Sequence, residues 1–197
     1  MILVALTKGR IEKKFYKLLK EKNIINNELN NKRKLYIDID NIYRLIVVKS
    51  DDVVNLVNNG YANIGIVGSD TITEYNYNNI KELLDLKTGV CNFSLASIPN
   101  ISINNINVVA TKYPNNTKRL LNSIGINPNI VTMSGSLELA PIINYADAIV
   151  DIVETGTTLR ENGLINIMNL EKISTRVITN DDNVNKENVK KLIKKIK

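Results

Sequence analysis

Short, almost entirely apolar runs recur along the chain and alternate with segments in which apolar residues follow helical spacing. Residues 2–6 (ILVAL) form one such run. A polar turn containing Gly9 follows, and Ile11, Phe15 and Leu19 then lie on one face of a predicted helix. A short apolar run with a glycine turn and an amphipathic helix behind it is typical of a buried strand in a parallel sheet.

The same alternation continues along the chain. Further strands are predicted in 34–39, 43–49, 63–68, 90–98, 106–114, 129–133, 147–153, 163–170 and 174–179. Further helices are predicted in 53–60, 114–121 and 185–197, and a helix or turn in 135–146. Gly60 and Gly125 stand where the helices before them are expected to end. This pattern predicts an α/β protein with a mainly parallel sheet, and the size fits two lobes with a boundary near Gly89.

Composition narrows the possible chemistry. With 197 residues, 44% of them hydrophobic, the chain can bury one large or two small α/β cores. It contains no histidine, which excludes imidazole catalysis, Ser-His and Cys-His triads and most zinc chemistry. Any metal must be held by oxygen ligands or arrive with a substrate. The single cysteine, Cys91, stands in an apolar run and is interpreted as a small buried hydrophobic residue.

The charge favours an anionic partner. The formal net charge is +6, with a pI near 9.3. Nucleic acid is not favoured, because aromatic residues make up 5% of the chain, tryptophan is absent and no arginine-rich strip occurs. The lysine-rich segment 185–197 is interpreted as a solvated helix face. No apolar run approaches the roughly 20 residues of a bilayer span, and the N-terminal run is too short for a signal peptide. We therefore expect a cytoplasmic protein with no membrane contact.

Polar loops follow four of the predicted strands. They are Thr7–Arg10, Gly68–Asp70, Ser134–Ser136 and Glu154–Thr158. In α/β folds, ligands bind at the carboxyl ends of strands, where helix N-termini and turn amides point outward. These four loops are therefore the candidate ligand-binding segments.

The loop Glu154-Thr155-Gly156-Thr157-Thr158 is the least like a packing sequence. Its turn amides and hydroxyls can surround a phosphate monoester. Asp151 and Glu154 would repel that phosphate unless they serve a second role, such as accepting hydrogen bonds from ribose hydroxyls or helping to hold Mg²⁺. A site that receives a phosphate and also accepts hydrogen bonds from a diol would fit a ribose phosphate. The alternative is a helix cap, with Thr157 or Thr158 as the N-cap residue.

Two other loops each have two interpretations, and for the first of them the helix dipole, which repels cations at a helix start, slightly disfavours solvated charges. Lys8 and Arg10 flank Gly9 and could clamp a polyphosphate, or they could be solvated charges at a helix start. Ser134, Gly135 and Ser136 could face a ligand, or a serine could begin a plain capping box with Glu138.

Five segments in order carry a resemblance to a known family. They are ALTKGR (5–10), YANIGIVGSD (61–70), VVATKYPN (108–115), SGSLELAP (134–141) and DAIVDIVETGTTLRENGL (147–164). Together they resemble the catalytic chain of ATP phosphoribosyltransferase, over nearly the whole chain. Acidic residues followed by TGTT also occur in other phosphoribosyltransferases, whereas five segments in this order are specific.

The resemblance implies that N1 of the ATP adenine attacks C1 of 5-phosphoribosyl 1-diphosphate and expels Mg²⁺-pyrophosphate, in the first step of histidine biosynthesis. It also implies an α/β, two-lobe, periplasmic-binding-protein-like fold with the substrates in a cleft. The first lobe would be 1–90 with 161–197, and the second 91–160. Mg²⁺ would be carried by the diphosphate rather than by protein ligands.

The resemblance also implies roles for particular residues. The 5-phosphate would lie on Thr155, Gly156, Thr157 and Thr158, and Asp151 and Glu154 would face the ribose hydroxyls. Lys8, Arg10 and Arg33 are the catalytic candidates for polyphosphate and leaving-group contacts. The further substrate-binding candidates are Gly9, Lys49, Asp70, Ser134, Gly135 and Ser136.

Two positions depart from the family pattern. Lys49-Ser50 stands where an Arg-Pro pair is expected, so the charge is kept but the bidentate fork is lost. Ser69 stands where many relatives have lysine before the aspartate. The chain ends about 18 residues after VITN, which matches the short form of the family. That form works with a regulatory subunit similar to histidyl-tRNA synthetase.

Two other classes of function compete with the enzyme. A two-lobe solute-binding protein could capture an anion without chemistry, and an export signal would favour it. A nucleic-acid-binding protein is favoured by the pI alone, and a steep salt dependence of DNA affinity would support it.

Overall fold

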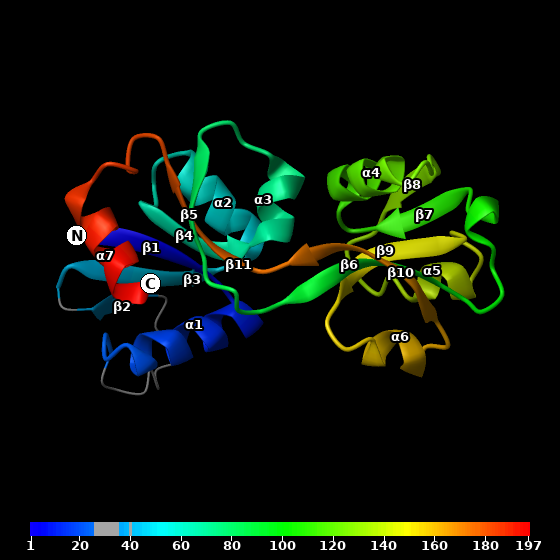
Figure 1. The fold of residues 1–197 in the computed structure, drawn as a ribbon, viewed down its shortest axis with the longest axis horizontal. Coiled ribbons are helices and arrows are strands. Elements are labelled where there is room, and N and C mark those ends of the chain that lie inside the picture. Colours follow the sequence, from blue (N-terminus) through cyan, green and yellow to red (C-terminus); the bar gives the residue numbers. More distant parts are fainter. Residues whose placement is uncertain (26–35, 40) are drawn as a thin grey trace. The chain divides into compact units, whose positions relative to one another are not determined.

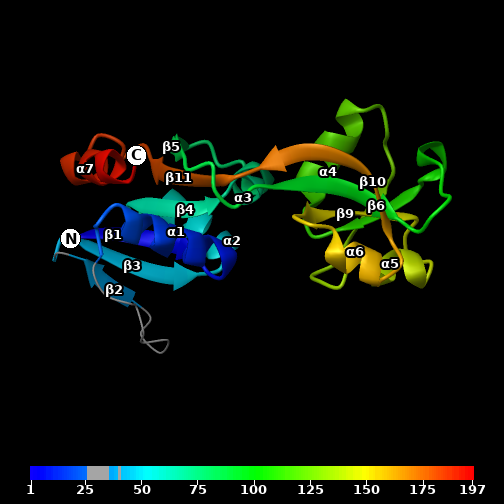
Figure 2. The same ribbon diagram turned by 60° about the horizontal axis from the view of Figure 1, so that its bottom comes forward.

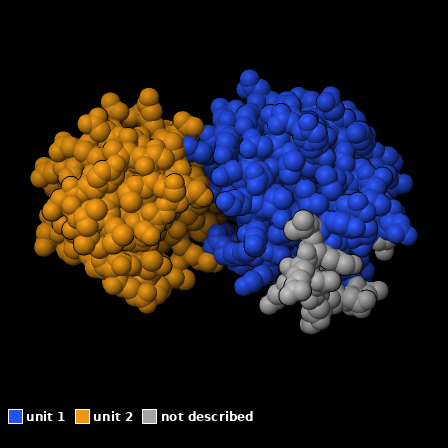
Figure 3. Space-filling view, turned by 180° about the vertical axis from the view of Figure 1, so that it is seen from behind, with its two compact units in different colours: residues 1–89, 174–197 blue, residues 90–173 orange. Residues whose placement is uncertain are grey.

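The computed structural model describes residues 1–25, 36–39 and 41–197, and the chain divides into two compact units. Unit 1 comprises residues 1–89 and 174–197, and unit 2 comprises residues 90–173 (Figure 3). Each unit is a sheet with helices on both faces, as Figures 1 and 2 show. Within the described residues, no helix is both long and apolar enough to cross a bilayer.

Unit 1 is built on a six-stranded sheet in the order β2-β3-β1-β4-β11-β5. The strands are β1 (Ile2–Thr7), β2 (Tyr36–Ile39), β3 (Tyr43–Val48), β4 (Ile64–Gly68), β5 (Ile80–Asp85) and β11 (Thr175–Asn180). The helices are α1 (Arg10–Glu21), α2 (Ser50–Asn58), α3 (Ser69–Tyr75) and α7 (Glu187–Ile196).

Side-chain alternation along the strands of unit 1 creates two cores. Val4 and Leu6 of β1 pack in one cluster with residues of α1 and α7, while Ala5 packs in the other with residues of α2. A Cβ at Gly65 would lie 2.7 Å from the Ile178 side chain and 2.8 Å from that of Val53, so glycine permits the close approach of α2 and β11 to β4.

Unit 2 has a five-stranded sheet in the order β10-β6-β9-β7-β8. The strands are β6 (Cys91–Ser97), β7 (Val108–Thr111), β8 (Asn129–Thr132), β9 (Ala148–Val153) and β10 (Ile165–Ile173). The helical segments are η1 (Ile103–Asn105), α4 (Pro114–Ser123), α5 (Leu139–Ile142) and α6 (Thr157–Glu161). Helix α4 contributes to one apolar cluster and α5 and α6 to another. Cys91 is buried, as predicted.

The prediction of a mainly parallel sheet is wrong, because antiparallel pairs join part of the strands in each unit. The β3-β1-β4 and β8-β7-β9 neighbours are parallel. Strands β2, β5 and β11 of unit 1 and β6 and β10 of unit 2 join by antiparallel pairing. Each sheet therefore contains three neighbouring parallel strands, inside the sheet in unit 1 and at one side of it in unit 2, and these strands carry the candidate loops.

The second boundary between the units differs from the expected one. The sequence-based division assigned residues 161–173 to the first lobe. In the structure, β10 instead pairs antiparallel with β6, from Ile165 opposite Ser97 to Ile173 opposite Cys91, and so belongs to unit 2. The change of unit falls between Ile173 and Ser174.

Candidate active site at the strand ends

Three candidate segments of unit 1 meet at one edge of its sheet. Strands β3, β1 and β4 are parallel neighbours, and they are followed by Lys49, by Lys8-Gly9-Arg10 and by Ser69-Asp70 respectively. The backbone N–H of Lys8 donates to the Val48 carbonyl at 2.8 Å, which holds the first loop beside the end of β3. The predicted residues therefore lie at adjacent carboxyl ends, the usual place for a ligand in an α/β fold.

The loop after β1 has a conformation that favours glycine. Gly9 has φ +96°, and a Cβ there would meet no atom within 4 Å, so backbone strain rather than space selects glycine. Its N–H donates to the Glu12 carboxylate at 2.9 Å. Glu12 thereby offsets the unfavourable position of Lys8 and Arg10 at the start of α1, where the helix dipole repels cations.

Asp70 is buried at the start of α3, and its carboxylate folds back over Gly68. A Cβ on Gly68 would lie 2.0 Å from Asp70 Oδ1. Burial raises the pKa of the Asp70 carboxyl, and the Thr71 hydroxyl bond and the charge of Arg10 lower it part of the way. The structure thus brings together two residues, Arg10 and Asp70, that the sequence suggested separately.

Ser69, one of the departures from the family pattern, has a structural partner. Its N–H donates to the Ser174 carbonyl at 3.0 Å, and its hydroxyl accepts from the Ser174 N–H at 3.3 Å. Ser69 therefore fixes the start of α3 to the chain where it re-enters unit 1.

Unit 2 gathers its candidate loops in the same way. Strands β8, β7 and β9 are parallel neighbours, and they are followed by Ser134–Ser136, by Lys112 and by Glu154–Thr158. Ser134, Gly135 and Ser136 are exposed. The alternative capping box is not formed, because α5 begins after Glu138 as N-cap residue and has no side-chain cap bond.

The TGTT loop is a left-handed turn held by its own side chains. Gly156 has φ +69° and is the N-cap residue of α6. The hydroxyls of Thr155 and Thr157 are 3.0 Å apart, and the Thr157 N–H approaches Thr155 Oγ1 at 3.5 Å. The helix-cap alternative, with Thr157 or Thr158 as the N-cap residue, is wrong, since both lie inside α6 and Gly156 is its N-cap residue.

Asp151 stands in β9, just before this turn, and carries a perturbed carboxyl group. Its Oδ1 accepts the Ile152 N–H at 2.7 Å. Burial is the main cause that raises its pKa, and the charge of Glu138 adds to it. The hydrogen bond from the Ile152 N–H and the charge of Lys112 lower the pKa, and the net result is a pKa of about 6. Neither Lys112 nor Glu138 was predicted from the sequence as a site residue. The signal for Lys112 was its place directly after the apolar strand 108–111.

Other candidate positions remain outside this geometry. Arg33 lies outside the described residues. Among the residues that the structure describes, no group of three or more metal-ligating side chains occurs.

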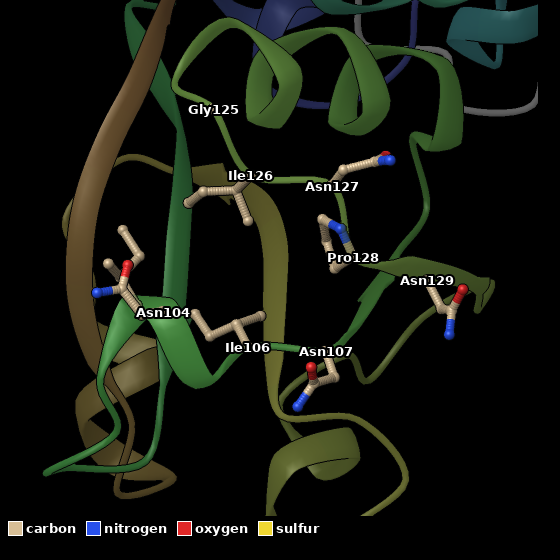
Figure 4. A pocket seen from close by; sticks show the side chains of 9 residues that line it. Asn104, Ile106, Asn107, Gly125, Ile126, Asn127, Pro128 and Asn129 are labelled. Carbon is tan, nitrogen blue, oxygen red and sulfur yellow. The ribbon is translucent and has the colours of Figure 1, made fainter.

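A pocket lies away from the candidate loops, near the starts of β7 and β8 (Figure 4). Its volume is about 370 Å³, and its lining residues are Ile103, Asn104, Ile106, Asn107, Gly125, Ile126, Asn127, Pro128 and Asn129. None of them is charged, so the pocket lacks the cations that a polyphosphate requires.

The fold of the two units defines a class. Over 99% of the chain, it is similar to the periplasmic VFT2 domain of BvgS from Bordetella pertussis (86% of that chain; TM-score 0.65, 11% identity). The CA3427 gene product of Candida albicans, described as having the generic periplasmic binding protein fold, gives a TM-score of 0.66 at 13% identity, over 100% of this chain and 69% of that one. The chain is thus a two-lobe α/β protein of the periplasmic-binding-protein-like class, as predicted.

Closer relatives identify the family. The HisG family model, ATP phosphoribosyltransferase, matches residues 49–197. An ATP phosphoribosyltransferase from Clostridium acetobutylicum is 46% identical, covering 100% of this chain and 94% of that protein, and one from Clostridium botulinum strain Okra is 45% identical, covering 91% and 87%. The solved ATP phosphoribosyl transferase (HisG:HisZ) complex from Thermotoga maritima has 31% identity and a TM-score of 0.82, covering 100% and 96%. The chain belongs to the ATP phosphoribosyltransferase family.

The family membership confirms the predicted activity. The chain is a pentosyltransferase that forms N1-(5-phosphoribosyl)-ATP in histidine biosynthesis. The solute-binding alternative is supported only by neighbours of low sequence identity, which share the fold alone.

Proposed function

We propose that the TGTT loop binds the 5-phosphate of 5-phosphoribosyl 1-diphosphate. The observation that supports this most strongly is the left-handed turn at Gly156, which brings the hydroxyls of Thr155 and Thr157 within 3.0 Å of each other at the carboxyl end of β9. Amides and hydroxyls gathered on such a turn suit the oxygens of a phosphate monoester. Thr158, in the first turn of α6, belongs to the same site.

Asp151 and Glu154 are the proposed acceptors for the ribose hydroxyls. Carboxylates accept two hydrogen bonds from a cis diol. Burial raises the pKa of Asp151 to about 6, so its carboxyl carries less negative charge at mildly acidic pH than an ordinary aspartate. Ser134, Gly135 and Ser136 follow the outer parallel strand and complete the proposed substrate-binding edge of unit 2.

The cations of unit 1 are the proposed polyphosphate ligands. Lys8, Arg10 and Lys49 follow adjacent parallel strands, and Asp70 supports Arg10 electrostatically. Gly9 belongs to the same loop, and Arg33 remains a proposal from the sequence. Mg²⁺ bound to the diphosphate would neutralise the leaving group.

The proposed chemistry requires no imidazole. As the adenine N1 lone pair forms a bond to C1, the C1–O bond breaks and pyrophosphate leaves with its electron pair. Positive charge develops on the ribose ring in this displacement, so positioning and stabilisation of the leaving group can supply the catalysis.

We also propose a partner and a location. The Thermotoga maritima relative is named as a HisG:HisZ complex. By analogy, this chain is a short-form catalytic subunit that works in the cytoplasm with a HisZ-like subunit similar to histidyl-tRNA synthetase.

Two probes test the division of roles by calorimetry. Ribose 5-phosphate carries the monoester and the diol, whereas Mg²⁺-pyrophosphate carries only the leaving group. Thr157→Val should weaken ribose 5-phosphate binding and leave pyrophosphate binding unchanged. Arg10→Ala should weaken pyrophosphate binding and leave ribose 5-phosphate binding unchanged. It should also lower kcat/KM by a factor on the order of 10 to 1,000. Equal effects of both variants on both probes would contradict the proposal.

A further inference from the structure

Arg160, which was not among the residues predicted for the site, folds back over the turn that precedes its own helix. Its Nη1 donates to the Thr155 carbonyl at 2.9 Å, and its Nη2 approaches the Thr157 hydroxyl at 3.2 Å. One planar guanidinium thus holds a backbone group before Gly156 and a side chain after it. A rigid fork of this kind fixes two acceptors relative to each other.

The same side chain constrains residue 156. A Cβ on Gly156 would lie 3.3 Å from Arg160 Nη1, and the glycine already has φ +69°. Glycine is therefore required twice, once by the left-handed backbone and once by the closeness of the guanidinium. The conformation of the turn and the position of the Arg160 side chain therefore depend on each other.

The electrostatic setting favours a cation at this point. Asp151 and Glu154 place negative charge near a loop that is proposed to bind phosphate. Arg160 is exposed and has no ion pair with a carboxylate among the described residues. Its guanidinium therefore bonds the loop itself rather than an acidic side chain.

We propose that Arg160 is a positioning residue for phosphoribosyl transfer, holding the Thr155–Thr157 turn in the conformation that receives the 5-phosphate. The inference rests on the proposed function of this turn. It assigns the effect to the fork of hydrogen bonds rather than to positive charge alone, because both acceptors belong to the turn.

Arg160→Lys separates the fork from the charge. Lysine keeps the charge but offers a single ammonium group in place of two parallel donors. Calorimetry with ribose 5-phosphate should show a loss of affinity on the order of 10-fold for Arg160→Lys and at least as much for Arg160→Ala. The KM for 5-phosphoribosyl 1-diphosphate should rise similarly while the KM for ATP stays unchanged, a split that general destabilisation would not produce.

Arg119→Ala is the matched control. Arg119 is an arginine of the same unit whose guanidinium is held by Glu171 at 2.9 Å, away from the turn. The Arg119→Ala variant should retain wild-type affinity for ribose 5-phosphate. Wild-type affinity in Arg160→Lys would overturn the positioning role, and so would equal losses in Arg119→Ala and Arg160→Ala.

Gly156→Ala separates this inference from the proposed function. Gly163 has φ +73° and open space around a Cβ, so Gly163→Ala supplies the same backbone strain away from the turn. If Gly156→Ala weakens ribose 5-phosphate binding while the Arg160 variants do not, the phosphate site stands and the role of Arg160 is refuted. If Gly156→Ala and Thr157→Val both bind like wild type, the phosphate site and the role of Arg160 are refuted together.

Discussion

The carboxyl group of Asp151, a proposed binding residue, lowers the stability of the folded chain at neutral pH. Its pKa rises from 3.8 to about 6, with burial as the first cause. Between these two values the folded chain binds more protons than the unfolded chain, so stability falls as the pH rises through this window. The full cost is present above pH 6. A shift of this size corresponds to at most about 3 kcal/mol, and partial exposure reduces it.

Asp151→Asn should therefore stabilise the protein selectively at neutral pH. Asparagine keeps the shape and removes the charge. Urea unfolding should show a variant whose stability advantage over wild type is clearly larger at pH 7.5 than at pH 4.5, while the KM for 5-phosphoribosyl 1-diphosphate rises because a diol acceptor is weakened. An equal stability difference at both pH values would contradict the assigned cause.

Some residue roles were predictable from sequence and others were not. The polar character of the TGTT loop was visible because it interrupts an apolar pattern. The contact between Arg160 and Thr155 was not, because it depends on the left-handed turn at Gly156. The influence of Glu138, before α5, on Asp151, in β9, joins two segments that only the folded unit brings together.

At the scale of elements, the junction of β4 and α3 makes Asp70 depend on the glycine before it. Gly68 has φ −72°, a backbone conformation open to any residue, and the nearest three atoms to an added Cβ all belong to Asp70. Glycine is therefore needed at position 68 because any larger residue would displace the Asp70 carboxylate.

Gly68→Ala should act on activity through Asp70. The added methyl displaces the carboxylate, and with it the support of Arg10, so kcat/KM should fall by a factor on the order of 10 or more. In an Asp70→Ala background the clash disappears, and Gly68→Ala should then have little further effect on kcat/KM. Additive losses in the double variant would show that Gly68 matters for a separate reason.

The elements themselves were largely predictable, but their pairing was not. Apolar runs located strands such as β1, β4 and β9, because a strand buried on both faces must be apolar along its length. The same composition says nothing of strand direction. The antiparallel additions of β6, β10 and β11 depend on pairing between distant segments, which single-sequence periodicity does not contain.

At the scale of the whole molecule, the boundaries between the two units were harder to predict from the sequence than the activity. The first boundary, near Gly89, has a glycine with φ +64°. The second lies between β10 and β11, which Ser174 alone separates, and neither glycine nor proline marks it. The family and its reaction, in contrast, followed from five ordered segments whose residues are proposed to carry the chemistry.

The most direct measurement is the reaction itself. Purified chain is incubated with ATP, 5-phosphoribosyl 1-diphosphate and Mg²⁺, with and without a HisZ-like subunit, and the products are identified by mass spectrometry. We expect N1-(5-phosphoribosyl)-ATP and pyrophosphate in equal amounts, and a lower rate with Thr157→Val. Absence of the adduct under both conditions, with the chain folded and both substrates intact, would contradict the account.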